Sequence, residues 1–423
     1  MFVKRAKSLM RYSSSLASLG LSTLSQIAIF VALARILPLD EFGIYTTLTA
    51  IAAFSLQITG LSSTDVIVRG VAKDQSRVKP LLGQTLILIM LSFAPVFLGS
   101  LALTFAVYQG LAPSQFPWRA AAELILANAI LFKFVSIPES LYLANGMVVR
   151  ANLVLAAYSV LRAAIILAAI VWLDVKSFED FAWLNLVFHI FSAVFALVLA
   201  LWMAGMPRFV LAKDDIVFGV GITILRSSMA MLQNLDRIML GALASPATVA
   251  IYGAAQRATS AGMIPVLAQL RSTYPRFFAA AQNSPQNLYA LARTTMRNVT
   301  IIGIGTAFLL FILAPLLPLA LGQNFAPSVG LLQALALMPL LSGIQNVFGD
   351  VLLATDHPMM RTVTGLSSAA LGILTMAITV PRFGLTGIVI AVYCTSIFSV
   401  LTSGFAIQLM SGSLLTWRSG AAK

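Results

Sequence analysis

Hydrophobic positions along the chain fall into twelve long runs, which are separated by short stretches rich in Pro, Gly and charged residues. Each run approaches the ~20 apolar residues that a helix needs to cross a hydrocarbon core of roughly 30 Å. The pattern therefore predicts an all-α integral membrane protein with about twelve transmembrane helices. The predicted spans are residues 13–34, 43–64, 81–108, 120–142, 151–172, 181–203, 216–240, 249–270, 299–321, 329–353, 362–380 and 385–409.

Basic residues are distributed unevenly between the segments that connect these spans. The terminal segments and every second connection carry eighteen Lys and Arg residues, whereas the opposite loops carry four, namely Arg35, Arg119, Lys176 and Arg382. Cytoplasmic loops of membrane proteins carry an excess of Lys and Arg. We therefore expect a bacterial cytoplasmic (inner) membrane protein whose N-terminal segment 1–12 and C-terminal tail 410–423 both lie in the cytoplasm.

The predicted spans divide evenly about a cytoplasmic linker at residues 204–215. Residues 13–203 and 216–409 each contain six spans and each begin on the cytoplasmic side. Shifts of 207 and 211 residues align a few side chains between the halves: Gln26 with Gln233, Glu139 with Asp350, and Arg150 with Arg361. We predict two six-helix bundles related by a parallel pseudo-two-fold repeat, which would rock about a shared cavity to give alternating access.

The overall composition agrees with this assignment. Of the 423 residues, 59% are hydrophobic and 10% are charged, whereas a soluble domain has roughly 25% charged residues. The net charge of +13 would indicate nucleic acid in a soluble protein, but here it follows from the basic cytoplasmic loops, so no nucleic-acid partner is expected. The single cysteine, Cys394, lies in an apolar run, and we expect a small packed side chain there.

Some basic residues remain inside the predicted spans, where a charge at the bilayer centre costs roughly 2.5–3.5 kcal/mol. They are Lys133, Arg162, Arg226, Arg237 and Arg257. At a rise of about 1.5 Å per residue, Arg162 and Arg226 are predicted to lie roughly 15 Å deep, near the midplane. Each of these cations needs a partner or a wet cavity.

Polar residues share helical faces with several of these cations. Ser159 lies with Arg162 on one stripe, Gln233 lies with Arg226 on another, and Ser18, Ser22 and Gln26 form a third in the first span. We expect these faces to meet in a cationic interior that suits an anionic substrate. The candidate substrate-binding residues are Arg162, Arg226, Lys133, Arg257, Gln26, Gln233 and Asn234.

The alternative is that the arginines form buried ion pairs. Candidate anions are Glu123, Glu139, Asp236 and Asp350. Asp236 is adjacent to Arg237 and favours a structural role for that arginine, but no acidic residue is expected at the depth of Arg162 or Arg226. His189, alone in the sixth span, is more typical of a satisfied polar residue than of a proton relay.

Enzyme motifs are missing from the sequence. Two histidines and one cysteine are too few for a metal cluster, and no P-loop is present. Asp40 and Glu41 admit two interpretations, the acidic pair of a membrane glycosyltransferase or a helix N-terminal pair, and the second is favoured. All predicted outer loops are short, which leaves little room for a catalytic domain. We therefore expect a transporter, with no cofactor, rather than an enzyme.

Five segments, in order, resemble the polysaccharide transporters, which are the O-antigen-type lipid-linked oligosaccharide flippases of the multidrug/oligosaccharidyl-lipid/polysaccharide (MOP) exporter superfamily. These segments are residues 34–45, Gly60-Leu61-Ser62-Ser63 with Val68-Arg69, residues 233–241, Tyr274-Pro275-Arg276 and residues 381–387. The resemblance implies a V-shaped fold like that of multidrug and toxic compound extrusion (MATE) transporters. It also implies flipping of undecaprenyl-pyrophosphate-linked oligosaccharide to the outer leaflet, with membrane lipids, a polysaccharide polymerase and export machinery as further candidate partners.

Three other functions compete with this interpretation. A major-facilitator carrier shares the six-plus-six layout, but residues 65–80 do not match its usual motif and its long central loop is missing. A drug exporter of the MOP superfamily is opposed by the expected cationic interior. A polymerase or glycosyltransferase of glycan assembly is opposed by the short outer loops.

Overall fold

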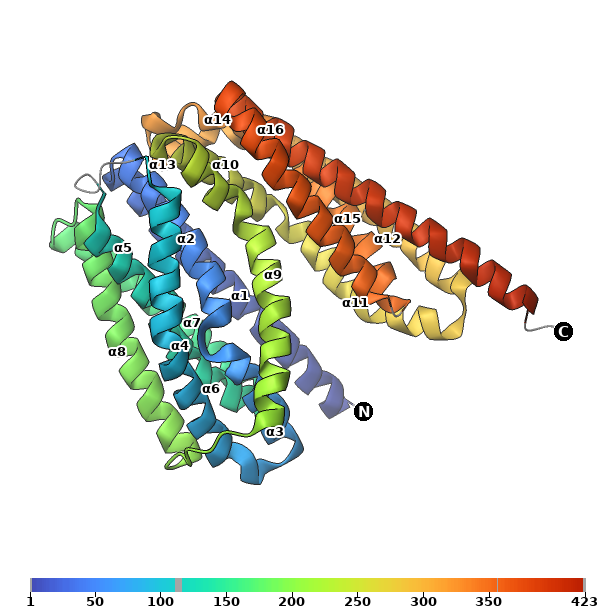
Figure 1. Cartoon of the computed structure of the whole chain (residues 1–423), viewed down its shortest axis with the longest axis horizontal. Coiled ribbons are helices and arrows are strands. Elements are labelled where there is room, and N and C mark those ends of the chain that lie inside the picture. The colour runs from blue at the N-terminus through green and yellow to red at the C-terminus, as the bar shows by residue number, and fades with distance from the viewer. Residues whose placement is uncertain (1, 111–115, 356, 421–423) are drawn as a thin grey trace. The chain divides into compact units, whose positions relative to one another are not determined.

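The computed structural model describes residues 2–110, 116–355 and 357–420. The side chains of residues 2–17, 19, 232, 275, 283, 285, 358 and 410–420 lie outside this description, and with them the basic side chains predicted for the two cytoplasmic ends. Every regular element within the described ranges is helical (Figure 1). The predicted all-α fold class is confirmed.

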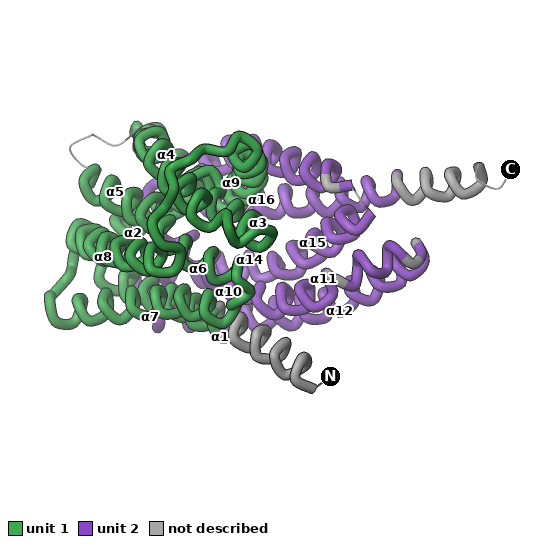
Figure 2. The backbone as a smooth tube through the Cα atoms, turned by 90° about the horizontal axis from the view of Figure 1, so that it is seen from below, with its two compact units in different colours: residues 1–242 green, residues 243–423 purple. Residues whose placement is uncertain are grey.

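The chain forms two compact units, Met1–Ala242 and Leu243–Lys423 (Figure 2). Unit 1 contains α1 Phe2–Ile36, α2 Leu39–Ile58, η1 Thr59–Ser62, α3 Ser63–Lys73, η2 Gln75–Arg77, α4 Val78–Val107, α5 Trp118–Ile125, the π-helical turn η4 Leu126–Leu131, α6 Phe132–Ala144, α7 Val148–Trp172, α8 Phe178–Ala204 and nearly all of α9 Lys213–Leu243. Unit 2 contains α10 Pro246–Gly262, α11 Ile264–Asn283, α12 Pro285–Leu313, η5 Ala314–Leu316, α13 Leu317–Leu321, η6 Gln323–Phe325, α14 Ser328–Leu335, α15 Met338–Ala354 and α16 Pro358–Gly420.

The boundary between the units lies one helix beyond the linker predicted at 204–215, because α9 packs with the helices that precede it. The sequence assigns α9 to the second six-span half of the repeat, and that assignment stays a prediction.

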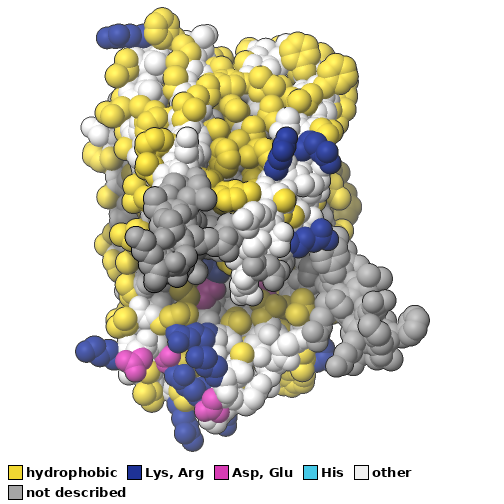
Figure 3. Space-filling model, turned by 90° about the vertical axis from the view of Figure 1, so that its right-hand side faces the viewer, with side chains coloured by type: hydrophobic (Ala, Val, Ile, Leu, Met, Phe, Trp, Pro, Cys, Tyr) yellow, Lys and Arg dark blue, Asp and Glu magenta, His cyan; other side chains and the backbone are white. Residues whose placement is uncertain are grey.

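Eight helical segments among the described residues are long and apolar enough to cross a membrane, and a ninth is added if the bent α9 is one span. On the face drawn in Figure 3, hydrophobic side chains cover most of the upper part, whereas many Lys and Arg side chains gather toward the lower end. The chain is thus a multi-pass membrane protein. Two predicted spans differ in detail: 249–270 falls on both α10 and α11, and the last two spans lie on either side of a bend in α16 at Gly384.

Helix boundaries recur between the units. Helix α5 begins at Trp118 and α6 ends at Ala144, and their counterparts α14 and α15 begin and end 210 residues later, at Ser328 and Ala354. The following helices, α7 and α16, also begin 210 residues apart. Both predicted spans are interrupted at the same place, by η4 in unit 1 and by a short turn between α14 and α15 in unit 2. These matches support the predicted repeat.

The unit 1 core that positions the site lies between α3, α4, α6 and α8. Ile67, Leu82, Ile89 and Ile137 are each fully buried within it. In unit 2 the expectation of a packed side chain at Cys394 is wrong: this side chain is exposed on α16, because an apolar run in a membrane protein includes positions on the outer faces of its helices as well as packed ones.

Candidate functional site

A break between α2 and α3 is the origin of the site. Three consecutive residues have a positive φ, namely Gly60 at 68°, Leu61 at 47° and Ser62 at 51°. Such a conformation costs roughly 1–2 kcal/mol for a residue with a side chain. Glycine is required at position 60 because an added Cβ would lie 2.9 Å from Ile89 Cγ1. A strained break of this kind persists only where neighbouring groups hold it.

Hydrogen bonds to three other helical segments hold the break. The Gly60 N–H donates to Ser92 Oγ of α4 (2.8 Å), and Thr223 Oγ1 of α9 donates to Ser62 Oγ (3.0 Å). Thr59 Oγ1 donates to the carbonyl oxygen of Ala129 in η4 (2.8 Å). The first bond satisfies a backbone N–H that the break would otherwise leave unpaired, and the other two tie the break to α9 and η4.

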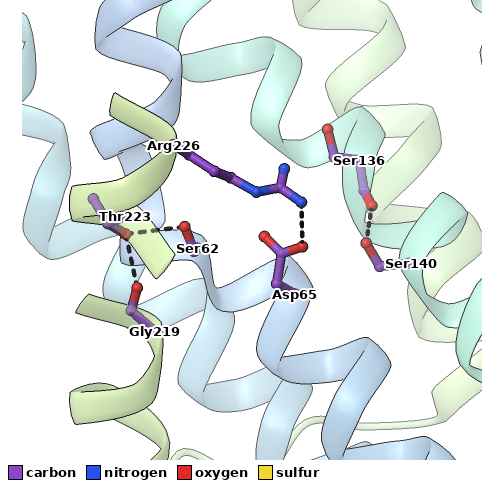
Figure 4. Close-up of polar contacts among 7 residues, drawn as sticks. All are labelled: Ser62, Asp65, Ser136, Ser140, Gly219, Thr223 and Arg226. Atoms are coloured by element: carbon purple, nitrogen blue, oxygen red, sulfur yellow. Dashed lines mark hydrogen bonds and ion pairs between the residues drawn. The ribbon is translucent and has the colours of Figure 1, made fainter. Parts of the chain in front are cut away.

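The break also determines where α3 begins relative to the membrane span that the sequence predicts. Helix α2 has 20 residues, which span about 30 Å, so α3 begins near the end of the span that the sequence predicts to be cytoplasmic. Arg226 of α9 lies at the same level, because its Nη2 donates to Asp65 Oδ1 in the first turn of α3 at 2.6 Å (Figure 4). The expectation that no acidic residue lies at the depth of Arg226 is therefore wrong, whereas its position near the midplane stays a prediction.

The sequence carries a signal for this pair beyond the charged positions in the spans. The run Gly60-Leu61-Ser62-Ser63 is typical of a helix interruption, and an acidic residue soon after it is typical of a helix N-terminus. Together the two features predict Asp65 in the first turn of a new helix, not in a cytoplasmic connection. The Arg226 side chain is 53% exposed and that of Asp65 is 24% exposed, so the guanidinium keeps donors for a further anion.

Two more charged residues lie around this ion pair, both on α6. The Lys133 side chain follows η4, and it interacts electrostatically with Asp65, Arg226 and Glu139. The residue is only 7% exposed, yet within the described part of the chain its ammonium makes no hydrogen bond or ion pair. The cluster thus holds two cations and two carboxylates. The predicted cationic interior is compensated here, and the free ammonium is the group best placed to receive an added anion.

A second polar cluster joins α7 and α8. Arg162 Nε donates to Asn185 Oδ1 (3.0 Å), and His189 Nδ1 lies 2.6 Å from the Asn185 carbonyl oxygen. The Tyr158 hydroxyl lies 2.6 Å from His189 Nε2. A neutral imidazole that donates from Nδ1 and accepts at Nε2 satisfies both contacts. This geometry favours the satisfied polar residue over the proton relay.

The polar stripe of the first span packs against the stripe of α7. Ser159 Oγ donates to Ser22 Oγ (3.0 Å), and Ser18 Oγ donates to the Asn152 carbonyl oxygen (2.8 Å). Hydrogen bonds of this kind join helices within a membrane. These serines therefore hold α1 against α7, whereas Gln26, farther along α1, is exposed.

The remaining predicted site residues lie elsewhere. Gln233 is exposed on α9, and Asn234 is buried, where its Oδ1 accepts from Arg237 Nη2 at 2.5 Å. Arg257 belongs to α10 of unit 2. Of the seven predicted residues, the structure brings Lys133 and Arg226 together in one cluster.

The other acidic residues have local partners. Glu123 pairs with Arg119 one helical turn away at 2.9 Å, and Asp350 lies 3.6 Å from Arg361. Asp40 and Glu41 occupy the first turn of α2, where Glu41 Oε2 accepts from the Phe178 N–H (2.8 Å). That position agrees with a helix N-terminal pair rather than with a catalytic one.

Known proteins share the sequence pattern and the fold described above. Residues 9–281 match the family model described as polysaccharide biosynthesis protein, and no curated protein matches the chain. A multidrug resistance MATE family transporter of the MOP superfamily in an inward-facing conformation is similar, with a TM-score of 0.77, 14% identity and coverage of 94% of this chain and 99% of that chain.

Two further solved structures are similar over most of their length. An outward-facing conformation of a multidrug resistance MATE family transporter has a TM-score of 0.62 at 16% identity, covering 97% of this chain and 96% of that one. A MOP superfamily transporter from Pyrococcus furiosus Vc1, for which reverse polarity of the binding pocket suggests a different function, has a TM-score of 0.61 at 17% identity, covering 96% of each chain. The predicted MATE-like membrane fold is confirmed.

Proposed function

Because the chain belongs to the polysaccharide biosynthesis protein family and has the fold of the MOP-superfamily membrane transporters, we propose that it is a lipid-linked oligosaccharide flippase. Its cargo is an undecaprenyl-pyrophosphate-linked oligosaccharide, moved from the inner to the outer leaflet by alternating access for exopolysaccharide, capsule or O-antigen synthesis. The protein lies in the bacterial inner membrane with both termini in the cytoplasm. Its partners are the cargo, membrane lipids, a polymerase and the export machinery.

The observation that supports this proposal is the buried ammonium of Lys133 beside the Arg226–Asp65 pair. The pair lies near the predicted cytoplasmic end of the span, where a lipid-linked pyrophosphate begins its passage. A phosphate oxygen accepts charge-assisted hydrogen bonds from both Lys and Arg side chains. The entering diphosphate competes with Asp65 for Arg226 and gives the Lys133 ammonium a direct hydrogen-bond acceptor.

The test is flipping of a defined lipid-linked oligosaccharide by the purified protein in proteoliposomes. Loss of one charge-assisted contact of roughly 1.5–3 kcal/mol lowers the rate about tenfold or more. We expect this decrease for Lys133→Gln and Arg226→Gln, while Lys73→Gln, an exposed lysine in the last turn of α3, keeps the normal rate. Normal flipping by both cluster variants contradicts the proposed role of the cluster, and no flipping by the unmodified protein contradicts the function.

A second candidate function is export of a cationic small molecule, and the carboxylates of Asp65 and Glu139 favour it. These two anions lie in the same cluster as the cations, so the interior repels a cationic substrate less than the sequence indicated. Transport of a cationic dye by the same proteoliposomes, lost in Asp65→Asn and retained in Lys133→Gln, would support this alternative over the flippase.

A further inference from the structure

A long apolar groove runs between α6, α7 and α8 of unit 1, and none of the four residues of the charged cluster lines it. Its volume is about 770 Å³, and apolar side chains make up most of its lining, among them Leu153, Leu161, Ile165, Phe191, Phe195 and Leu199. The groove exists because α7 packs mainly on α1 and α6, and α8 packs mainly on α5 and α6, so that these two consecutive helices meet over only part of their length, at the Arg162–Asn185 and Tyr158–His189 contacts. Its volume is in the range of sites that bind a ligand.

The groove is long and narrow. Its lining runs from Arg150 to Ile165 along α7 and from Leu184 to Leu199 along α8. Fifteen residues of helix correspond to about 22 Å, which is most of a hydrocarbon core of roughly 30 Å. An extended hydrocarbon segment that lies along the membrane normal matches this length, so a long polyprenyl chain would place the part next to its phosphate in the groove.

One end of the groove carries a charge. Arg150, in the first turn of α7, is the only charged residue of the lining. Its Nη1 contacts the Met147 sulfur at 3.5 Å, and no carboxylate among the described residues lies within ion-pair distance of it. The first turn of a helix also favours anions. The sequence predicts that this end faces the cytoplasm, where the head groups of the inner leaflet lie.

The repeat provides an independent comparison. The helix boundaries recur at 210 residues and Arg361 of unit 2 follows Arg150 by 211, so it lies one residue from the equivalent position; it is paired with Asp350. The residue that corresponds to Asp350 in unit 1 is Glu139, which instead interacts with the interior cluster. The arginine near this position of the repeat is therefore paired with a carboxylate in unit 2, whereas in unit 1 it has no ion pair among the described residues and can bind an external anion.

We propose that the groove binds the hydrocarbon chain of a polyprenyl phosphate lipid, with its phosphate at Arg150. The inference rests on the proposed function, because this lipid is the carrier part of the cargo. A single chain fits one groove with one cationic end, whereas a phospholipid would bring two chains. The hydroxyl of Tyr158 is already bonded to His189, so the middle of the groove suits a ligand without polar atoms along its length.

The position of the groove relates it to the charged cluster. Val135 and Pro138 of α6 line the groove, while Lys133 and Glu139 of the same helix belong to the cluster. One helix thus separates the tail of the lipid from the site proposed for its diphosphate during transport. Arg150 holds the phosphate before that transfer.

The experiment uses the full-length protein in nanodiscs with a photoreactive diazirine analogue of undecaprenyl phosphate that carries no sugar. After irradiation, mass spectrometry of peptides locates the label. We expect labelling on α7 and α8, displaced by excess undecaprenyl phosphate and not by phosphatidylglycerol. Ala157→Trp fills the groove and lowers the labelling severalfold, whereas Ala164→Trp, an exposed alanine on the same helix outside the lining, leaves it unchanged.

The role of Arg150 is tested in the same assay. Arg150→Gln lowers the labelling severalfold, and Lys73→Gln does not. Equal displacement by phosphatidylglycerol, or labelling that is unchanged in Ala157→Trp, overturns the inference and leaves an ordinary bilayer lipid in the groove. The labelling assay measures binding of a lipid without sugar, and the flipping assay measures transport of the oligosaccharide lipid, so each hypothesis can fail without the other. Flipping without groove labelling refutes lipid binding in the groove. Groove labelling without flipping refutes the flippase function.

Discussion

The α6–α7 junction of unit 1 and the α15–α16 junction of unit 2 occupy the same place in the repeat but use their charges differently. In unit 2, Asp350 and Arg361 lie 3.6 Å apart and join the two helices. In unit 1, Glu139 lies with the interior cluster and Arg150 lines the apolar groove. The same kind of carboxylate and arginine therefore form an ion pair in one unit and face different surroundings in the other, the interior cluster for Glu139 and the groove for Arg150.

The largest expected effect comes from exchanging the two charges of a pair. Asp65→Arg combined with Arg226→Asp restores an ion pair in unit 1, so the melting temperature in detergent should return toward that of the unmodified protein. Flipping should remain reduced about tenfold or more, because the cation that receives the diphosphate has moved.

The matched exchange in unit 2, Asp350→Arg with Arg361→Asp, should restore both the melting temperature and flipping. Normal flipping by the unit 1 exchange would mean that its pair is as structural as that of unit 2, and the comparison between the units would then fail.

A smaller effect is expected when only the arginine is removed. Arg361→Gln leaves the nearly buried Asp350 carboxylate without its partner, whereas the Arg361 side chain itself is 30% exposed. We expect a loss of about 1–2 kcal/mol in stability, between the values for exposed and buried pairs, as measured by unfolding in detergent. Arg150→Gln should change the stability little, since that arginine has no ion pair among the described residues. A similar loss in both variants would contradict the proposed difference.

The smallest effect comes from giving unit 1 the partner that unit 2 already has. Met147→Glu places a carboxylate three residues before Arg150, where the methionine sulfur now contacts the guanidinium. A helical pair of this type is worth about 0.2–0.5 kcal/mol. We expect labelling of the groove by the prenyl phosphate probe to fall about twofold, and Met147→Gln to leave it unchanged. Undiminished labelling in Met147→Glu would argue against an anion at Arg150.

The membrane fold was predictable because each span is a long apolar run, and such a run has few alternatives to a helix in a bilayer. Bends were harder to predict. Residues 249–270 read as one apolar stretch, but the chain turns into a second helix near Met263. The π-helical turn at Leu126–Leu131 has no local sequence signal. Its Ala129 carbonyl oxygen accepts a hydrogen bond from Thr59, a residue distant in the sequence, so neighbouring residues do not reveal the turn.

The candidate site was predictable in part. Lys133 and Arg226 were identified because a charge within an apolar run needs a partner. The identity of that partner depends on how α2 breaks at Gly60, which brings Asp65 beside a helix 161 residues farther along the chain. The apolar groove had no sequence signal, since its lining residues are indistinguishable from side chains that face lipid. Only the packing of α7 and α8 onto different neighbours reveals it.

The exposed position of Cys394 on α16 has a practical consequence for measuring the proposed alternating access. The thiolate is the form that attacks maleimides, and it is disfavoured in hydrocarbon; Cys394 lies in an apolar segment long enough to cross the membrane. The only native cysteine should therefore react slowly with water-soluble maleimides. Cysteines introduced beside the cluster, for example at Ser136, can then be scanned for accessibility with the native residue in place, so that labelling reports when water reaches this part of the protein.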